Sequence, residues 1–75
     1  MPTINTPVRV TFESFYKDRI LVVETHADKL IELFDRFEIL EVFDLETGEI
    51  YYYNDPNSDP AEYMAESLKT FLGTL

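Results

Sequence analysis

The chain is 75 residues long, 45% hydrophobic and 28% charged, which suits one small folded domain and is too apolar for a disordered chain. Cysteine is absent, which excludes disulfides, zinc–thiolate sites and cysteine nucleophiles, and no apolar run approaches the roughly 18–20 residues that span a bilayer. Fifteen acidic and six basic side chains give a net charge of −9, which repels nucleic acids and anionic membranes and favours basic partners.

A β-hairpin is predicted at the start of the chain. Residues 1–7 contain two prolines and are expected to form an N-terminal arm ahead of a single domain, residues 8–75. Residues 8–13 alternate apolar and polar side chains, as half-buried strands do. Residues 16–19 are expected to turn the chain. Residues 20–23 are a continuous apolar run, which favours a second strand with both faces covered.

A helix is predicted next, because apolar residues recur at helical spacing. These residues are Ala27, Leu30, Ile31 and Phe34. Thr25 is expected to be the N-cap, with Asp28 three residues later as a weaker variant of the capping box. We expect the helix to end near Arg36 or Phe37.

A second hairpin follows in the predicted order. Residues 38–44 alternate loosely, and residues 50–53 form the return strand. Residues 46–49 lie between them and contain Gly48, which we expect to supply the positive φ that a tight turn requires.

The predicted last helix begins after a loop over residues 54–60. Asp59 is expected to be its N-cap, with Pro60 at the first helical position and Glu62 at the third. Its apolar stripe consists of Ala61, Met64, Leu68, Phe71 and Leu72. Gly73 is expected to cap its C-terminus.

The predicted elements define an α+β fold class with the order ββαββα. The simplest architecture is a two-layer sandwich, an antiparallel sheet with two helices on one face. The other face of the sheet is then open to solvent or to a partner.

The acidic side chains are concentrated in the second half of the chain. Residues 1–36 carry six acids and five bases, whereas residues 37–75 carry nine acids and one base. Crowded like charges destabilise a compact fold, so such an excess is informative, although solubility alone is the simpler explanation.

The acids and tyrosines of the second half are therefore the candidate partner-binding residues. They are Glu41, Asp44, Glu46, Glu49, Tyr51, Tyr53, Asp55, Asp59, Glu62 and Glu66. Strand alternation predicts that Tyr51 and Tyr53 share one face, where tyrosine would act as an interface hot spot. Glu62 and Glu66 are predicted to form a like-charge pair on the last helix. In size and acidity the chain resembles phage-encoded DNA mimics and anti-CRISPR-like inhibitors, without a shared motif.

Catalysis, cofactors and metals are not expected. The chain has a single histidine, His26, and no P-loop, dinucleotide fingerprint or zinc motif. Residues 55–66 partly match a calcium-binding loop, but Pro60 occupies the position that requires glycine.

Two functional hypotheses follow from the sequence. The first is an inhibitor-like protein-binding module that occludes or sequesters a basic partner protein, with nucleic-acid-binding proteins as the favoured class. The alternative is a structural subunit that self-associates through its sheet face or edge, for example as a homodimer in which Lys17 and Arg19 meet the acidic half of a second copy. Since residues 1–5 lack the features of a signal peptide, a cytoplasmic location is expected.

Overall fold

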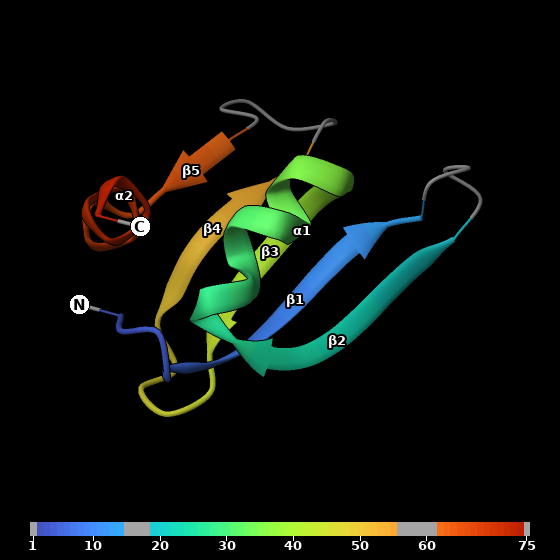
Figure 1. The fold of residues 1–75 in the computed structure, drawn as a ribbon. Helices are drawn as coiled ribbons and strands as arrows, with labels where there is room; N and C mark the ends of the chain where they lie inside the picture. The colour runs from blue at the N-terminus through green and yellow to red at the C-terminus, as the bar shows by residue number, and fades with distance from the viewer. Residues whose placement is uncertain (1, 15–18, 56–61, 75) are drawn as a thin grey trace.

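The protein is an α+β domain built on one antiparallel sheet (Figure 1). The structure is a computed structural model, and it describes residues 2–14, 19–55 and 62–74. The strands are β1 (Pro7–Glu13), β2 (Ile20–His26), β3 (Glu38–Asp44), β4 (Ile50–Asn54) and β5 (Glu62–Met64). A 3₁₀ turn, η1 (Ala27–Lys29), leads into helix α1 (Leu30–Arg36), and helix α2 (Glu66–Gly73) follows β5. The spatial order of the strands is β2-β1-β3-β4-β5.

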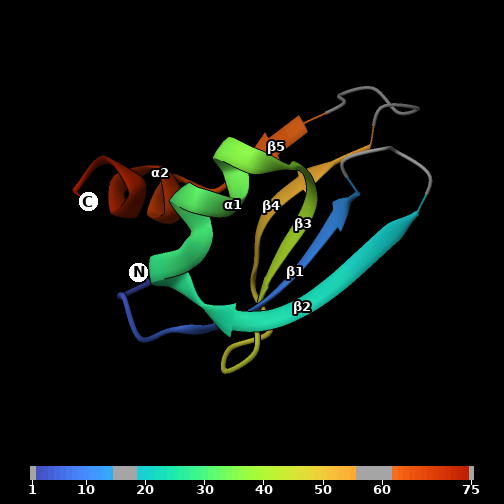
Figure 2. The ribbon, with the colours of Figure 1, turned by 45° about the vertical axis from the view of Figure 1, so that its right-hand side comes forward.

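The hydrophobic core lies between the sheet and the two helices (Figure 2). Along β1, Val8, Val10 and Phe12 are buried, while the residues between them are half-buried on the other face. Leu30 of α1 and Leu68 of α2 are fully buried in the same core cluster. Burial of each such side chain stabilises the fold by about 1.5–3 kcal/mol. The alternation of apolar and polar residues in β1 therefore determines which face of the sheet packs against the helices.

The prediction that the strand at residues 20–23 is covered on both faces is wrong. β2 pairs with β1 as the predicted hairpin requires, but it is the edge of the sheet and its apolar side chains are exposed. The aromatic side chains of Phe34 in α1 and of its C-cap residue Phe37 reach other strands instead. The Phe37 ring lies 4.6 Å from Phe12 of β1, and the Phe34 ring lies 5.0 Å from Tyr52 of β4. α1 thus packs over the middle of the sheet and leaves β2 uncovered.

The start of the first helix also differs from the prediction. Thr25 pairs with Val8 inside the β1–β2 ladder, so it is not an N-cap. η1 begins at Ala27, whose N–H donates to the carbonyl of Thr6 at 2.9 Å, and this bond ties residues 2–6 to the helix. The 3₁₀ turn shifts the helical phase, which leaves Ile31 exposed. The predicted end of the helix near residue 36 is confirmed.

The predicted last helix begins too early. Residues 62–64 form strand β5, in which Tyr63 pairs with Tyr53 of β4. The N–H of Ala65 donates to the carbonyl of Tyr51 at 2.9 Å, and α2 starts only at the following residue. Gly73 is the last helical residue, with Thr74 as the C-cap. The order is therefore ββαβββα, because β5 pairs with the outer edge of β4 before the last helix begins.

The turn between β3 and β4 is organised around the buried carboxylate of Asp44. Gly48 adopts the predicted positive φ of 79°. One oxygen of Asp44 accepts the N–H groups of Glu46 and Thr47 at 2.7 and 3.0 Å. The other accepts the hydroxyl of Tyr51 at 2.6 Å. Burial acts to raise the pKa of Asp44, but these hydrogen bonds outweigh it and hold the pKa below its ordinary value.

Removal of the Tyr51 hydroxyl should destabilise the fold. Tyr51→Phe leaves a buried carboxylate without one donor, and we expect a loss of about 1–3 kcal/mol in the free energy of unfolding at pH 7, measured by urea denaturation. Because the folded-state pKa of Asp44 is lowered, its contribution is present above the ordinary pKa and is lost as the pH falls through the folded-state value. The difference between Tyr51→Phe and the natural protein should therefore narrow in acid.

Tyr63→Phe is the matched control, since Tyr63 is 52% exposed. We expect it to change stability by less than about 0.5 kcal/mol. Equal losses in the two variants would show that the Asp44 bond is not the cause.

Candidate functional site

The face of the sheet opposite the helices is the candidate site. In the view of Figure 2 both helices lie on one side of the sheet, and no helix in the described part of the chain covers the other side, which we call the open face. Directly opposed residues of an antiparallel pair share a face, so the register identifies which side chains lie there. One row crosses all five strands and contains Val22, Thr11, Glu41, Tyr53 and Tyr63. A second row contains Glu24, Arg9, Phe43 and Ile50.

Two register shifts decide which residues of β3 and β4 reach the open face. In β4, Val42 pairs with Tyr52 and Phe43 pairs with Ile50, so Tyr51 is an extra residue. A bulge of this kind breaks strand alternation, and Tyr51 and Tyr52 are both buried on the helix side. The prediction that Tyr51 shares a face with Tyr53 is therefore wrong, and only Tyr53 lies on the open face.

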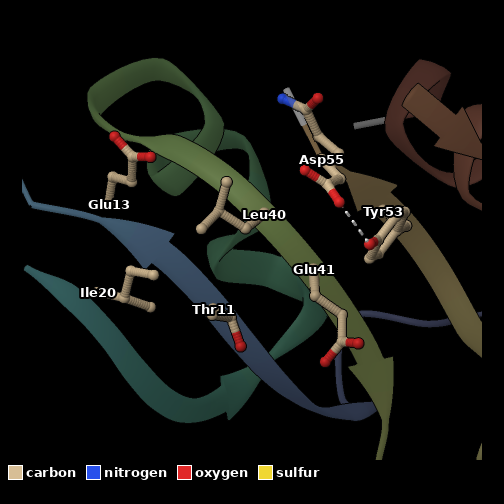
Figure 3. Close-up of a pocket in the computed structure, with 8 residues that line it drawn as sticks. Thr11, Glu13, Ile20, Leu40, Glu41, Tyr53 and Asp55 are labelled. Atoms are coloured by element: carbon tan, nitrogen blue, oxygen red, sulfur yellow. Dashed lines mark hydrogen bonds between the residues drawn. The ribbon is translucent and has the colours of Figure 1, made fainter. Parts of the chain in front are cut away.

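A shallow depression of about 340 Å³ lies on the open face (Figure 3). Its lining residues are Thr11, Glu13, Ile20, Leu40, Glu41, Tyr53, Asn54 and Asp55. Three of them are carboxylates, and the hydroxyl of Tyr53 donates to Oδ2 of Asp55 at 3.3 Å. The second register shift is in β3, where Glu41 pairs with Thr11 and Ile39 pairs with Phe12 of β1. Leu40 is therefore an extra residue, and it lines the depression.

Negative charge dominates the strands. The five strands contain six acidic residues and only one Lys or Arg, which is Arg9. Arg9 is already engaged: Nη2 lies 3.4 Å from Oε1 of Glu41, and its guanidinium lies 4.6 Å from the centroid of the Phe43 ring. Glu13 lies directly opposite Glu38 in the register, a like-charge pair that costs stability. The depression is therefore an anionic site, flanked by one cation that already has partners.

Asp55 also sets the ionisation of Tyr53. The charge of the Asp55 carboxylate, with smaller contributions from desolvation, their hydrogen bond and Glu41, raises the pKa of Tyr53 above its ordinary value. The other two tyrosines of the run are different, because burial is the main cause. Burial raises the pKa of Tyr52 to about 12 and also raises the pKa of Tyr51, with hydrogen bonds to Glu62 and Asp44 acting in the same direction.

The ten predicted partner-binding residues do not share one surface. Asp44 and Tyr51 are buried against each other, so neither is available to a partner. Glu46 and Glu49 lie in the turn before β4, whereas Asp55 follows β4 at its other end.

Glu62 and Glu66 do not form the predicted helical pair. Glu62 is on β5, where Oε2 accepts the hydroxyl of Tyr52 at 2.9 Å, and Glu66 is on α2, 3.4 Å from Nζ of Lys69. Asp59 lies outside the described residues. The structure thus brings together Glu41, Tyr53 and Asp55 from the predicted set.

Five lining residues were not predicted from the sequence: Thr11, Glu13, Ile20, Leu40 and Asn54. The alternation of β1 contained the signal for the first two, because it sets Thr11 and Glu13 opposite the buried valines. Leu40 could not be found in this way, since its position depends on a register shift that strand alternation does not show.

Within residues 2–14, 19–55 and 62–74, no group of three His, Asp or Glu side chains could hold a metal ion. The helices in these ranges are too short and too polar to cross a membrane. In comparisons with known proteins, no family model, curated protein or solved structure matches the chain.

Neutralising Asp55 should lower the pKa of Tyr53. In Asp55→Asn the nearby negative charge that disfavours the phenolate is removed, so the pKa should move toward the ordinary value of tyrosine. NMR titration of ¹³C-labelled tyrosine rings measures this residue by residue. In Glu49→Gln, the control, the pKa of Tyr53 should not change; a shift of equal size there would contradict the assignment to Asp55.

Proposed function

We propose that this protein is a small binding module that docks a basic partner protein on its open sheet face and thereby occludes or sequesters it. The depression lined by Glu13, Glu41 and Asp55 is the observation that carries this proposal. Nucleic-acid-binding proteins are the favoured partner class, because they concentrate lysine and arginine on the surface that meets the phosphates.

The chemistry of the depression fits a cationic side chain. A guanidinium or ammonium group can form charge-assisted hydrogen bonds with carboxylates, which are shorter and stronger than neutral ones. The ring of Tyr53 offers an additional face for a cation. Tyr53 and Tyr63 are 41% and 52% exposed, so a partner that covers them buries large aromatic area with little loss of conformational freedom.

The arrangement supports a local docking site rather than imitation of DNA over the whole molecule. The longest extent of the domain is 31 Å, whereas the Debye length at physiological salt is about 8 Å. Glu46, Glu49 and Glu66 are outside the depression and act mainly on encounter rate. Glu13, Glu41 and Asp55 act at short range, where a bound cation is shielded from solvent.

Removal of the three carboxylates should weaken binding of a basic probe. The probe is an arginine-rich peptide, with affinity measured by calorimetry and the binding surface mapped by amide NMR shifts. We expect Glu13→Gln/Glu41→Gln/Asp55→Asn to lose at least about tenfold in affinity, equivalent to about 1.4 kcal/mol. Shift changes should centre on Thr11, Tyr53 and Asn54. Binding of the natural protein should weaken steeply as salt rises.

The control variant is Glu46→Gln/Glu49→Gln/Glu66→Gln, which removes the same charge away from the open face. We expect it to lose no more than about threefold in affinity, since only long-range attraction changes. Equal losses would show that net charge rather than the depression binds the probe, and shift changes centred on the β3–β4 turn would place binding elsewhere.

A further inference from the structure

β2 is an edge strand with an exposed apolar surface on both of its faces. Four consecutive side chains are 36–63% exposed: Ile20, Leu21, Val22 and Val23. Natural edge strands are usually short, charged or covered, because a long apolar edge pairs with other chains. β2 has seven residues and one acidic side chain, Glu24, so it has few of these protections.

The hydrogen-bond pattern shows which backbone groups of β2 face outward. The N–H of Ser14 donates to the carbonyl of Arg19, and the N–H of Ala27 donates to the carbonyl of Thr6, each at 2.9 Å. In an antiparallel pair, every second residue of a strand directs its backbone N–H and C=O groups toward the partner strand. In β2 these are the odd-numbered residues, which bond to β1. Ile20, Val22 and Glu24 therefore direct their N–H and C=O groups away from the sheet, on the side where no strand of residues 2–14, 19–55 and 62–74 pairs with β2.

We propose that a second copy of this chain pairs antiparallel with β2, centred on Val22, so that two five-stranded sheets become one. A two-fold axis perpendicular to the sheet places residues of the same face opposite each other. Val22 then meets the partner's Val22 and exchanges both backbone hydrogen bonds with it. Leu21 meets the partner's Val23 on the helix side, which buries apolar area from both copies.

The distribution of charge favours a second copy of the chain as the partner that pairs with β2. Residues 19–36 carry three bases and four acids, whereas residues 37–75 carry nine acids and one base. Pairing through β2 joins the copies at their nearly neutral side and keeps the acids of β3 and β5 away from the two-fold axis. The register centred on Val22 also places Glu24 opposite the partner's Ile20, whereas a shift of the centre to Val23 would make the two Glu24 side chains diagonal neighbours.

A groove beside β2 is consistent with the pairing. It has a volume of about 380 Å³ and lies between β2 and α1. Val23, Leu33 and Phe37 form its apolar part, and the other lining residues are Glu24, Thr25, Lys29, Glu32 and Arg36. The partner's Leu21 lies opposite Val23 on the helix side of the shared sheet, so its side chain borders this groove and adds apolar contact there.

Cysteine cross-linking tests the pairing and its register. The chain has no native cysteine, so each single substitution introduces one thiol. Opposed residues of a hydrogen-bonded pair lie about 5.5 Å apart between Cα atoms, within the disulfide range of roughly 4.4–6.8 Å. Under mild oxidation Val22→Cys should give a disulfide-linked dimer at least about tenfold faster than Glu24→Cys, whose thiols would be about four residues out of register. Ile31→Cys, on the exposed side of α1, gives the background rate. Equal rates for all three would overturn the proposal, and faster linking of Glu24→Cys would overturn the register.

Sedimentation velocity and hydrogen exchange on the natural chain provide the second test. We expect a concentration-dependent dimer, with slowed exchange at the amides of Ile20, Val22 and Glu24 only where the dimer is populated. Val22→Lys should abolish the dimer, and Ile31→Lys, which adds the same charge elsewhere, should not. A monomer at all concentrations, with fast exchange at these amides, would overturn the inference.

Salt separates this inference from the proposed function. Added salt screens the repulsion between two copies of charge −9, so dimerisation should strengthen from about 50 mM to about 500 mM salt. Binding of the basic probe should weaken over the same range. A dimer that weakens with salt would contradict pairing through the apolar edge and would leave the open-face proposal unaffected.

Discussion

Two short helices must shield the packed side of a five-stranded sheet. α1 has seven residues and α2 has eight, so they extend only about 10–12 Å, whereas five strands at about 4.8 Å spacing span about 19 Å. The aromatic side chains of Phe34 in α1 and of its C-cap Phe37 reach β4 and β1, and the core forms in the middle. Among the described residues, no helix covers the edge strand β2 or the opposite face of the sheet. The open face and the edge strand β2, on which the two proposals are based, are exposed because the helices are short.

The register shifts in β3 and β4 convert the uncovered face into a specific one. The shift in β4 turns Tyr51 inward, where its hydroxyl satisfies the buried carboxylate of Asp44 and fixes the turn before it. The shift in β3 turns Leu40 outward beside Glu41. Uniform alternation would leave a flat surface. With both shifts, Tyr53, Glu41 and Glu13 from three different strands line one depression.

Local patterns in the sequence predicted which segments form strands, turns and helices better than they predicted which other elements cover or pair with those segments. The alternation of residues 8–13, the positive φ of Gly48 and the end of α1 were accessible because each depends on adjacent residues. The exposure of β2 was not, since a continuous apolar run is typical of a buried strand and only the strand order makes it an edge. β5 was not predicted for a related reason: its three residues form a strand by pairing with residues 52–54 of β4, which lie about ten residues earlier in the chain. For the site, the sequence singled out acids and tyrosines as candidates, but which of them lie together depends on the register shifts in β3 and β4.

The location of the acids bears on whether charge serves more than solubility. Solubility is served by either sign and by any exposed position, including turns and helix surfaces. Acidic residues are unfavourable in strands, yet the five strands contain six acids and one base, and Glu13 directly faces Glu38. Asp44 is explained by its hydrogen bonds within the fold. Glu13 and Glu41 instead line an open depression, with Arg9 as the one Lys or Arg of the strands and already bonded to Glu41. These acidic side chains lower the stability of the sheet, and they lie next to the exposed ring of Tyr53. Their position therefore supports the proposal that the open face binds a cation.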